Sequence, residues 1–431
     1  MRIAFLTPGT GNYYCGVCMR DNSLARYLID HGHDVTVLPT YLPHFLDEEP
    51  AVLKSPIFFG GINVYLQHKF PIFRKTPKWI DRLFDSQGLL RWAANRKGMT
   101  TARELGEITL STFRGKNGPL AKEVDKVTDW FRTNGVPDVL LLSTVMLAGV
   151  GRVVSKELKV PTLAFLQGED GFLDSLLPEF REEAWNILGT DARNLDGCIS
   201  PSSSFAKLMS KRLQIPEGKI YHLPNGISMN GYSSALNPPE VPTLGYFARL
   251  CPEKGLDLLI DAFIELKKSG DHSSLKLSVA GTLPQENKPY LEEQKRKISA
   301  AGLSSAFEIQ TNLNRIEKIN FLQTLSLFCV PARIPEAFGL YVIEAMAAGI
   351  PVVLPDHGSF PEIIKDTGGG LIYPSNDPSS LTKSLTTLLT DSKGAHNLGQ
   401  TGREEVRQNF SNEKLANFLV NNILAPILRT D

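Results

Sequence analysis

MRIAFLTPGTGNYYCGVCMRDNSLARYLIDHGHDVTVLP, residues 1–39, contains an apolar run, a glycine-rich loop, a helical pattern and a second apolar run. The runs at 2–8 and 34–38 have the length of buried strands, and apolar residues recur at helical spacing from Met19 to about Asp30. A strand, a helix and a strand in this order require a parallel sheet with a right-handed crossover. Ligands of such sheets bind beyond the carboxyl ends of the strands. The opening stretch therefore predicts an α/β fold.

The alternation of strands and helices recurs along the chain. Apolar runs in the first half predict buried strands that begin at Ile62, Asp138, Thr162, Gly197 and Ile220. Runs in the second half predict strands that begin at Thr243, Leu275, Phe307, Leu327, Pro351 and Leu371. Two helix faces are also predicted, one from Leu258, Leu259, Ala262, Phe263 and Leu266, the other from Leu415, Phe418, Leu419 and Ile423. Two doubly wound halves without internal repetition are expected.

The domain boundaries follow from a change in composition. Residues 230–242 are rich in Pro, Ser and Asn and predict a linker. We therefore expect an N-terminal Rossmann-like domain over 1–235, with a variable basic and aromatic insertion at 46–132, and a C-terminal Rossmann-like domain over 240–408. A last helix over 409–431 is expected to pack back toward the N-terminal domain. Two such domains whose strand ends face each other form a cleft, a favoured site for small ligands.

Composition excludes several classes of function. The 431 residues include 46 Lys or Arg and 46 Asp or Glu, so no global charge favours nucleic acid. No apolar run is long enough to span a bilayer, and the N-terminus lacks the pattern of an export signal. The 5 cysteines are odd in number and scattered, which is typical of a reducing compartment. We expect a cytoplasmic protein.

Residues 66–103 form a basic stretch with 9 Lys or Arg against 2 Asp. Apolar residues around Trp79 and Phe84 recur at helical spacing, which predicts one or two amphipathic helices. One interpretation is peripheral contact with the inner face of a membrane or with an anionic acceptor. The alternative is that these helices cover the sheet of their own domain and have a solvated basic edge.

Two glutamates stand eight positions apart in PEAFGLYVIEAMAAGIP, residues 335–351. Gly339 and Leu340 are expected to open a helix whose free N–H groups favour a phosphate. Glu344, two turns in, has the chemistry to accept hydrogen bonds from a ribose diol, and Glu336 from a sugar hydroxyl. Alternatively, Glu336 only starts the helix and Glu344 lies on a solvated face.

Other candidate residues lie on strand-to-helix loops. Arg249 and Lys254 in FARLCPEKGLDLL follow the first strand of the second half, and two cations there favour a diphosphate. The first loop, with Gly16, lacks the spacing of a dinucleotide fingerprint. Cys15 and Cys18 at its end also match a thioredoxin-like redox pair, a function of a different class.

These motifs, in this order, resemble the retaining glycosyltransferases of the GT-B fold, the large nucleotide-sugar-dependent family known as glycosyl transferases group 1 or family 4-like. The likeness is best from Ile199 to Glu362, where three segments match, namely ISPSSSFAKLMSKRLQIPEGKIYHLPNGI, GYFARLCPEKGLDLLIDAF and PEAFGLYVIEAMAAGIPVV. Residues 46–132 correspond to the part of the family that varies with the acceptor. The resemblance implies transfer of a sugar from a nucleotide-diphosphate sugar to a sugar, glycan or lipid-linked acceptor.

The resemblance also implies roles for individual residues. Arg249 and Lys254 would bind the donor diphosphate, and Glu336 would contact the transferred sugar. The remaining donor-binding residues would be Gly16, Phe338, Gly339, Leu340 and Glu344. Neither a metal nor a cofactor beyond the sugar nucleotide is expected, because the two cations stabilise the leaving group.

The sequence departs from the family at one place. Many relatives carry a histidine after the strand that here ends TLAFLQGED, where this chain has Gln167, Gly168, Glu169 and Asp170. Gln167, Glu169 and Asp170 are therefore candidate sugar or acceptor contacts. Two further functions remain open, a catalytically weak nucleotide-sugar-binding protein and a sugar-nucleotide epimerase on the same fold.

Overall fold

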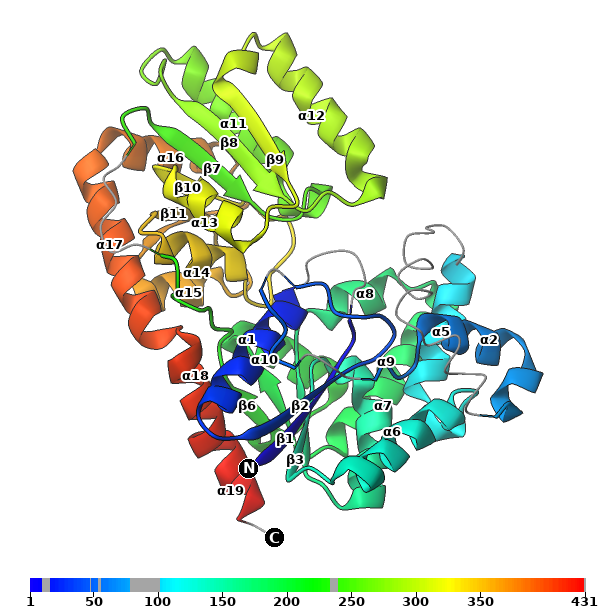
Figure 1. The fold of residues 1–431 in the computed structure, drawn as a ribbon. Coiled ribbons are helices and arrows are strands. Elements are labelled where there is room, and N and C mark those ends of the chain that lie inside the picture. The colour runs from blue at the N-terminus through cyan, green and yellow to red at the C-terminus, as the bar shows by residue number, and fades with distance from the viewer. Residues whose placement is uncertain (10–15, 47, 53–55, 78–100, 233–238, 430–431) are drawn as a thin grey trace. The chain divides into compact units, whose positions relative to one another are not determined.

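The computed structural model comprises two compact units (Figure 1). The residues that it describes are 1–9, 16–46, 48–52, 56–77, 101–232 and 239–429. Unit 1 consists of Met1–Pro224 and Leu415–Asp431, and unit 2 of Asn225–Lys414. Within the described ranges each unit contains a parallel sheet of 6 strands covered by helices, which confirms the predicted α/β class.

The sheet of unit 1 has the order β2-β1-β3-β4-β5-β6. Its strands are β1 Arg2–Thr7, β2 Asp34–Pro39, β3 Val139–Leu142, β4 Thr162–Phe165, β5 Gly197–Ser200 and β6 Ile220–His222. The helical segments are α1 Gly16–Asp30, α2 Gly61–Lys69, η1 Pro71–Lys75, α5 Ala102–Phe113, η2 Gly115–Asn117, α6 Ala121–Asn134, η3 Val145–Leu147, α7 Ala148–Leu158, α8 Glu169–Ser175, α9 Pro178–Arg193, α10 Ser203–Leu213 and η4 Glu217–Lys219.

One face of this sheet packs against two segments that are far apart in sequence. Alternate strand residues, among them Ile3 and Phe5, point to this face because side chains alternate across a strand. There they pack with Leu28 of α1 and with Leu419 and Ile423 near the C-terminus. The C-terminal segment contains α18 Asn412–Phe418, the π-helical η8 Leu419–Leu424 and α19 Ala425–Leu428. Residues from both ends of the sequence thus complete the core of unit 1.

The sheet of unit 2 has the order β12-β11-β10-β7-β8-β9. Its strands are β7 Thr243–Phe247, β8 Lys276–Gly281, β9 Phe307–Thr311, β10 Leu327–Cys329, β11 Val352–Pro355 and β12 Gly370–Tyr373. The helical segments are η5 Pro252–Lys254, α11 Leu256–Lys268, η6 Gln285–Asn287, α12 Lys288–Ala300, η7 Ser304–Ala306, α13 Arg315–Gln323, α14 Leu340–Ala347, α15 Phe360–Thr367, α16 Pro378–Thr390 and α17 Ser392–Asn409.

The structure corrects three details of the sequence-based prediction. The run that begins at Ile62 is not a strand but part of α2, because its buried residues Asn63, Val64 and Gln67 recur at helical spacing. Leu258 is exposed, so the buried face of α11 lies around Leu259 and Phe263 instead.

Phe418 is likewise exposed and does not belong to the buried stripe of the C-terminal segment. Ala416 and Leu424 are buried there together with the predicted Leu415, Leu419 and Ile423. The expected helices around Trp79 and Phe84 lie outside the described residues.

A buried carboxylate holds the turn between β4 and α8. Glu169 is 4% exposed, and its Oε1 accepts hydrogen bonds from the Thr144 hydroxyl at 2.6 Å and the Val145 N–H at 3.3 Å. Its Oε2 accepts the N–H of Gln167 at 2.8 Å. Burial raises the pKa of the Glu169 carboxyl, although these hydrogen bonds oppose the shift. Glu169 therefore ties this turn to the residues that follow β3.

The raised pKa of Glu169 predicts a pH dependence of stability. The folded protein holds this proton more tightly than the unfolded chain, so the free energy of unfolding should fall as pH rises from the ordinary value of 4.5 through the raised pKa. The slope is at most about 1.4 kcal/mol per pH unit. Glu169→Gln should remove this component, which urea unfolding of both proteins between about pH 5 and pH 8 measures.

The control is Glu182→Gln, which changes an exposed carboxylate of α9. It should leave the pH profile of the wild type unchanged. A difference in unfolding free energy between wild type and Glu169→Gln that stays constant with pH would contradict the prediction.

Candidate functional site

The loop between β7 and α11 carries Lys254. This residue ends η5, and the following Gly255 has a φ of 70°. A Cβ at Gly255 would lie 2.0 Å from the carbonyl oxygen of Pro331, so only glycine fits this position. Gly255 thereby places Lys254 against the loop that follows β10.

Lys254 and Glu336 form an ion pair in unit 2. Nζ of Lys254 contacts Oε1 of Glu336, and the two side chains are 15% and 14% exposed. The same Nζ lies 5.5 Å from the ring centroid of Tyr341. Burial, and then the charge of Glu336, raises the pKa of Tyr341 well above its ordinary value, so the phenol stays neutral. The structure thus brings together two side chains that the sequence assigned to one pocket.

The loop from Glu336 to Gly339 leads into the N-terminus of α14. The N–H of Ser359 donates to the carbonyl of Glu336 at 3.0 Å, and its hydroxyl donates to the carbonyl of Phe338. Gly339 has a φ of 94° and caps the helix, which begins at Leu340 as predicted. The first N–H groups of α14 have no acceptor within the helix, so this end favours an anion.

Glu344 lies inside α14 and is paired with Lys318 of α13. All residues of α14 from Val342 to Ala347 are buried, Glu344 being 8% and Lys318 4% exposed. Nζ of Lys318 lies 2.6 Å from Oε1 of Glu344. A carboxylate buried without a cation would cost several kcal/mol. Lys318 therefore stabilises Glu344, which is not the solvated position that the alternative interpretation required.

Arg333 binds both sides of the loop that carries Lys254. Its guanidinium forms a two-pronged pair with Asp257, Nη1 to Oδ1 at 2.8 Å and Nη2 to Oδ2 at 2.5 Å. Nη1 also donates to the carbonyl of Pro252 at 2.7 Å. Arg249, by contrast, is exposed, and its Nε donates to Sγ of Cys251 at 3.3 Å. Both ends of η5 are therefore fixed, whereas Arg249 before it is an exposed residue.

The candidate residues of unit 1 lie at the carboxyl edge of its sheet. Gly16 begins α1, and Gln167 and Asp170 are half-buried beyond β4. Burial raises the pKa of Asp170. The hydrogen bonds of Glu169 given above go to Gln167 in its own turn and to Thr144 and Val145 after β3, so its role as a sugar contact remains a prediction. Cys15 lies outside the described residues.

A buried arginine lies at the same edge. Arg20 is 5% exposed, its Nε donates to Oδ1 of Asp21 at 2.9 Å, and its Nη2 donates to the carbonyl of Ser143 at 3.3 Å. Its guanidinium stacks 3.9 Å from the ring centroid of Phe165. Among the described residues, Nη1 of Arg20 has no hydrogen-bond partner. A buried cationic N–H group thus remains unpaired near the ends of β3 and β4.

Sequence reasoning missed Lys318, Arg333 and Arg20. An acidic residue within an apolar helix requires a cation, so Glu344 was a signal for a partner but did not identify Lys318. Arg333 follows a predicted strand, which places it at the ligand-binding edge. The position of Arg20 within a helix gave no such signal.

Two searches of the described residues were negative. No group of three or more His, Cys, Asp or Glu side chains in these residues could hold a metal ion. None of the helices in the described ranges is both long and apolar enough to cross a bilayer.

Comparison with known proteins identifies a family model that matches most of unit 2. Residues 233–405 match the family model described as glycosyl transferases group 1. A lipopolysaccharide core biosynthesis mannosyltransferase of Rhizobium leguminosarum bv. viciae is 29% identical over 214 residues, which are 46% of this chain and 59% of that protein. This chain therefore spans less than two thirds of that relative's length.

Other relatives match over most of the chain. A GDP-mannose-dependent α-(1-6)-phosphatidylinositol monomannoside mannosyltransferase of Mycolicibacterium smegmatis is 25% identical over 380 residues, with 81% of this chain and 91% of that protein covered. Among solved structures, sucrose-phosphate synthase from Thermosynechococcus elongatus has a TM-score of 0.74 at 16% identity, and the alignment covers 100% of both chains. This likeness shows the GT-B type of fold. The family match, the relatives and the fold agree: residues 233–405 match the group 1 glycosyltransferases, and the whole chain has a fold of the GT-B type.

Proposed function

We propose that this protein transfers a sugar from a nucleotide-diphosphate sugar to an acceptor hydroxyl with retention of anomeric configuration. The observation that carries the proposal is the Lys254–Glu336 pair, which joins the loop between β7 and α11 to the loop that leads into α14. The cation and the free helix N–H groups are donors that suit the leaving phosphate. The carboxylate is an acceptor that suits a hydroxyl of the transferred sugar.

The proposed chemistry depends on charge at the leaving group. Sugar transfer passes through an oxocarbenium-like state while negative charge accumulates on the departing diphosphate. Lys254, Arg249 and the N-terminus of α14 would stabilise that charge, so the reaction needs no metal ion. Donor binding would draw Nζ of Lys254 to the phosphate and release the Glu336 carboxylate to accept a sugar hydroxyl. The leaving phosphate would then help to deprotonate the acceptor on the same face.

Glu344 would bind the nucleotide ribose. Its pair with Lys318 uses Oε1 and orients the carboxylate. An ionised carboxylate accepts hydrogen bonds from both hydroxyls of a vicinal diol. Mannose bound to GDP is the first donor to test, because two of the relatives described above are named mannosyltransferases and one of them is GDP-mannose-dependent.

We propose a lipid-linked or glycan acceptor at the cytoplasmic side of a membrane. Relatives are named for phosphatidylinositol mannoside and lipopolysaccharide substrates. Within the basic stretch, the described residues Phe70 and Ile72 are 48% and 75% exposed and lie beside Lys69 and Lys75. Exposed apolar side chains with basic neighbours favour an anionic lipid surface.

A double-mutant cycle tests the Glu344 site. Lys318→Met removes the cation that faces the buried Glu344 carboxylate, and Glu344→Leu removes that carboxylate; either change alone should lower the free energy of unfolding by about 3–5 kcal/mol. The double variant should recover most of this loss, because apolar residues replace the pair. It should nevertheless lose the rise in Tm that GDP or GDP-mannose gives the wild type. Two results would contradict the prediction: a loss of unfolding free energy in the double variant equal to the sum of the two single losses, or a double variant that still binds nucleotide.

Turnover of GDP-mannose tests the catalytic assignment. Lys254→Ala should lower kcat about 100-fold or more, because a cation opposite the leaving phosphate is lost. Wild-type turnover should persist in EDTA, and proton NMR of the product should show the anomeric configuration of the donor. Lys295→Ala, which breaks an exposed pair on α12, is the matched control and should leave kcat unchanged. Equal kcat in both variants would refute the role of Lys254.

Co-sedimentation with vesicles tests the membrane contact. The wild type should bind vesicles that contain phosphatidylglycerol at low salt and dissociate as salt rises, because basic residues contribute to the attraction. Ile72→Ser should weaken this binding. Ile316→Ser in unit 2 is the control, because Ile316 is 72% exposed, close to the 75% of Ile72. Absence of vesicle binding by the wild type would leave Phe70 and Ile72 as ordinary surface residues.

A further inference from the structure

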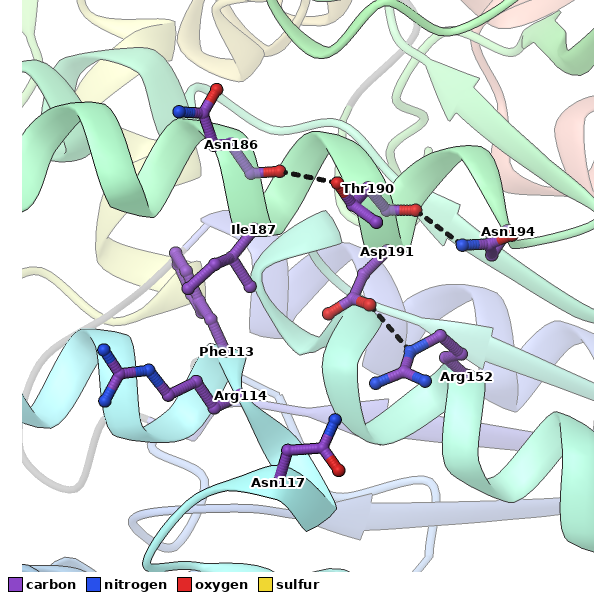
Figure 2. Close-up of a pocket in the computed structure, with 9 residues that line it drawn as sticks. All are labelled: Phe113, Arg114, Asn117, Arg152, Asn186, Ile187, Thr190, Asp191 and Asn194. Atoms are coloured by element: carbon purple, nitrogen blue, oxygen red, sulfur yellow. Dashed lines mark hydrogen bonds and ion pairs between the residues drawn. The ribbon is translucent and has the colours of Figure 1, made fainter.

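Unit 1 contains a groove between α5, α7 and α9 (Figure 2). Its volume is about 440 Å³, within the range of small-molecule sites. It is lined by Phe113, Arg114, Asn117, Arg152, Asn186, Ile187, Thr190, Asp191 and Asn194. All of these residues lie in helical segments or directly after one, so their positions are set by the packed helices of unit 1.

The groove is separate from the candidate residues at the carboxyl edge of the sheet. Asp191 and Asn194 lie at the C-terminal end of α9, and the chain enters the amino end of β5 at Gly197. Gln167 and Asp170 lie before α9, beyond the carboxyl end of β4. Because the sheet is parallel, these two sets of residues belong to opposite ends of unit 1.

The ion pair of Arg152 and Asp191 forms one wall of the groove. Nε of Arg152 lies 2.7 Å from Oδ1 of Asp191, but its N–H makes no hydrogen bond within the described residues because it does not point at that oxygen. Asp191 is 7% and Arg152 32% exposed at the side chain. Figure 2 shows the guanidinium at the groove beside Asp191. The terminal nitrogens of Arg152 are therefore available as donors.

Two amides add donors and acceptors to this wall. The side chains of Asn117 and Asn186 make no hydrogen bond in the part of the chain that the structure describes, whereas Nδ2 of Asn194 donates to the carbonyl of Thr190 at 2.8 Å. Each free amide can donate and accept. Ile187 contributes apolar surface between them. Donors, acceptors and apolar surface therefore alternate over a short distance.

The charge of the groove indicates a neutral ligand. Arg152 is balanced by Asp191, and Arg114 by Glu183, whose Oε1 lies 2.6 Å from Nη2 of Arg114. No excess positive charge is left to attract a phosphate. A sugar hydroxyl both donates and accepts a hydrogen bond, and the C–H face of a sugar ring is apolar. A neutral sugar therefore matches the groove better than a nucleotide does.

We propose that this groove is a second, non-catalytic sugar-binding site that holds a neutral hexose unit of a glycan. Asn117, Asn186 and Arg152 would bind its hydroxyls, and Ile187 would contact the ring. The assignment of this hexose to the acceptor glycan rests on the proposed function. The site would hold a part of that glycan distant from the reacting hydroxyl and so raise its affinity without entering the reaction.

The test measures oligosaccharide binding to the full chain. Saturation-transfer NMR and calorimetry with linear mannotetraose and maltotetraose should detect binding of at least one of them to the wild type. Asn117→Ala combined with Asn186→Ala should weaken that binding about fivefold or more, since two hydrogen-bonding groups are lost. These side chains make no hydrogen bond to any described residue, so the variant should fold. Asn186→Trp, which fills the groove, should weaken binding equally.

The control is Asn134→Ala. In the wild type the Asn134 amide donates to the carbonyl of Trp130 at 2.9 Å on α6, outside the groove. Its affinity for the oligosaccharide should equal that of the wild type. Failure of both oligosaccharides to bind the wild type, or equal affinity of the groove variants and the wild type, would overturn the inference. The rise in Tm with GDP separates the two proposals, because it should be the same in all these proteins. A GDP response without sugar binding would refute only the groove.

Discussion

The constraint on which unit 2 depends is a charged residue, Glu344, inside the buried part of the helix α14. α14 is buried from Val342 to Ala347, and its carboxylate, Glu344, has Lys318 as a partner. This pairing fixes α13 against α14. Gly339 caps α14, which begins at Leu340, and so sets where the free N–H groups lie. The buried ion pair, about one turn into α14, thus helps to hold the helix end that favours an anion.

The second pair of unit 2 differs from the first in burial and in expected behaviour. Lys254 and Glu336 are each about 15% exposed, against 5% and 10% for the side chains of Lys318 and Glu344. The less buried pair lies on loops, where the proposed donor phosphate would replace the carboxylate as the partner of the cation. The more buried pair is embedded between helices, where separation would leave both charges desolvated. One pair is suited to exchange partners and the other to hold geometry.

The sequence predicted the sheets better than it predicted the site. Strand runs, loop glycines and the start of α14 are local signals, because strand length, positive φ and helix capping depend on neighbouring residues. The strand predicted at Ile62 was wrong because a short apolar run has no period that separates a helix from a strand. Lys318, Arg333 and Arg20 were missed because their partners lie on other elements. Only the fold brings Lys318 to Glu344 across 26 positions of sequence.

Unit 1 is discontinuous in sequence, since Leu415–Asp431 completes a core that begins at Met1. Leu419, Ile423 and Leu424 fill one face of its sheet but leave the ribosome only after all of unit 2 has been synthesised. During translation that face stays incomplete while unit 2 already has all its strands. Unit 2 can therefore fold first, although its sequence begins after the whole sheet of unit 1. Until Leu415–Asp431 covers it, the apolar face of the unit 1 sheet would be exposed to aggregation.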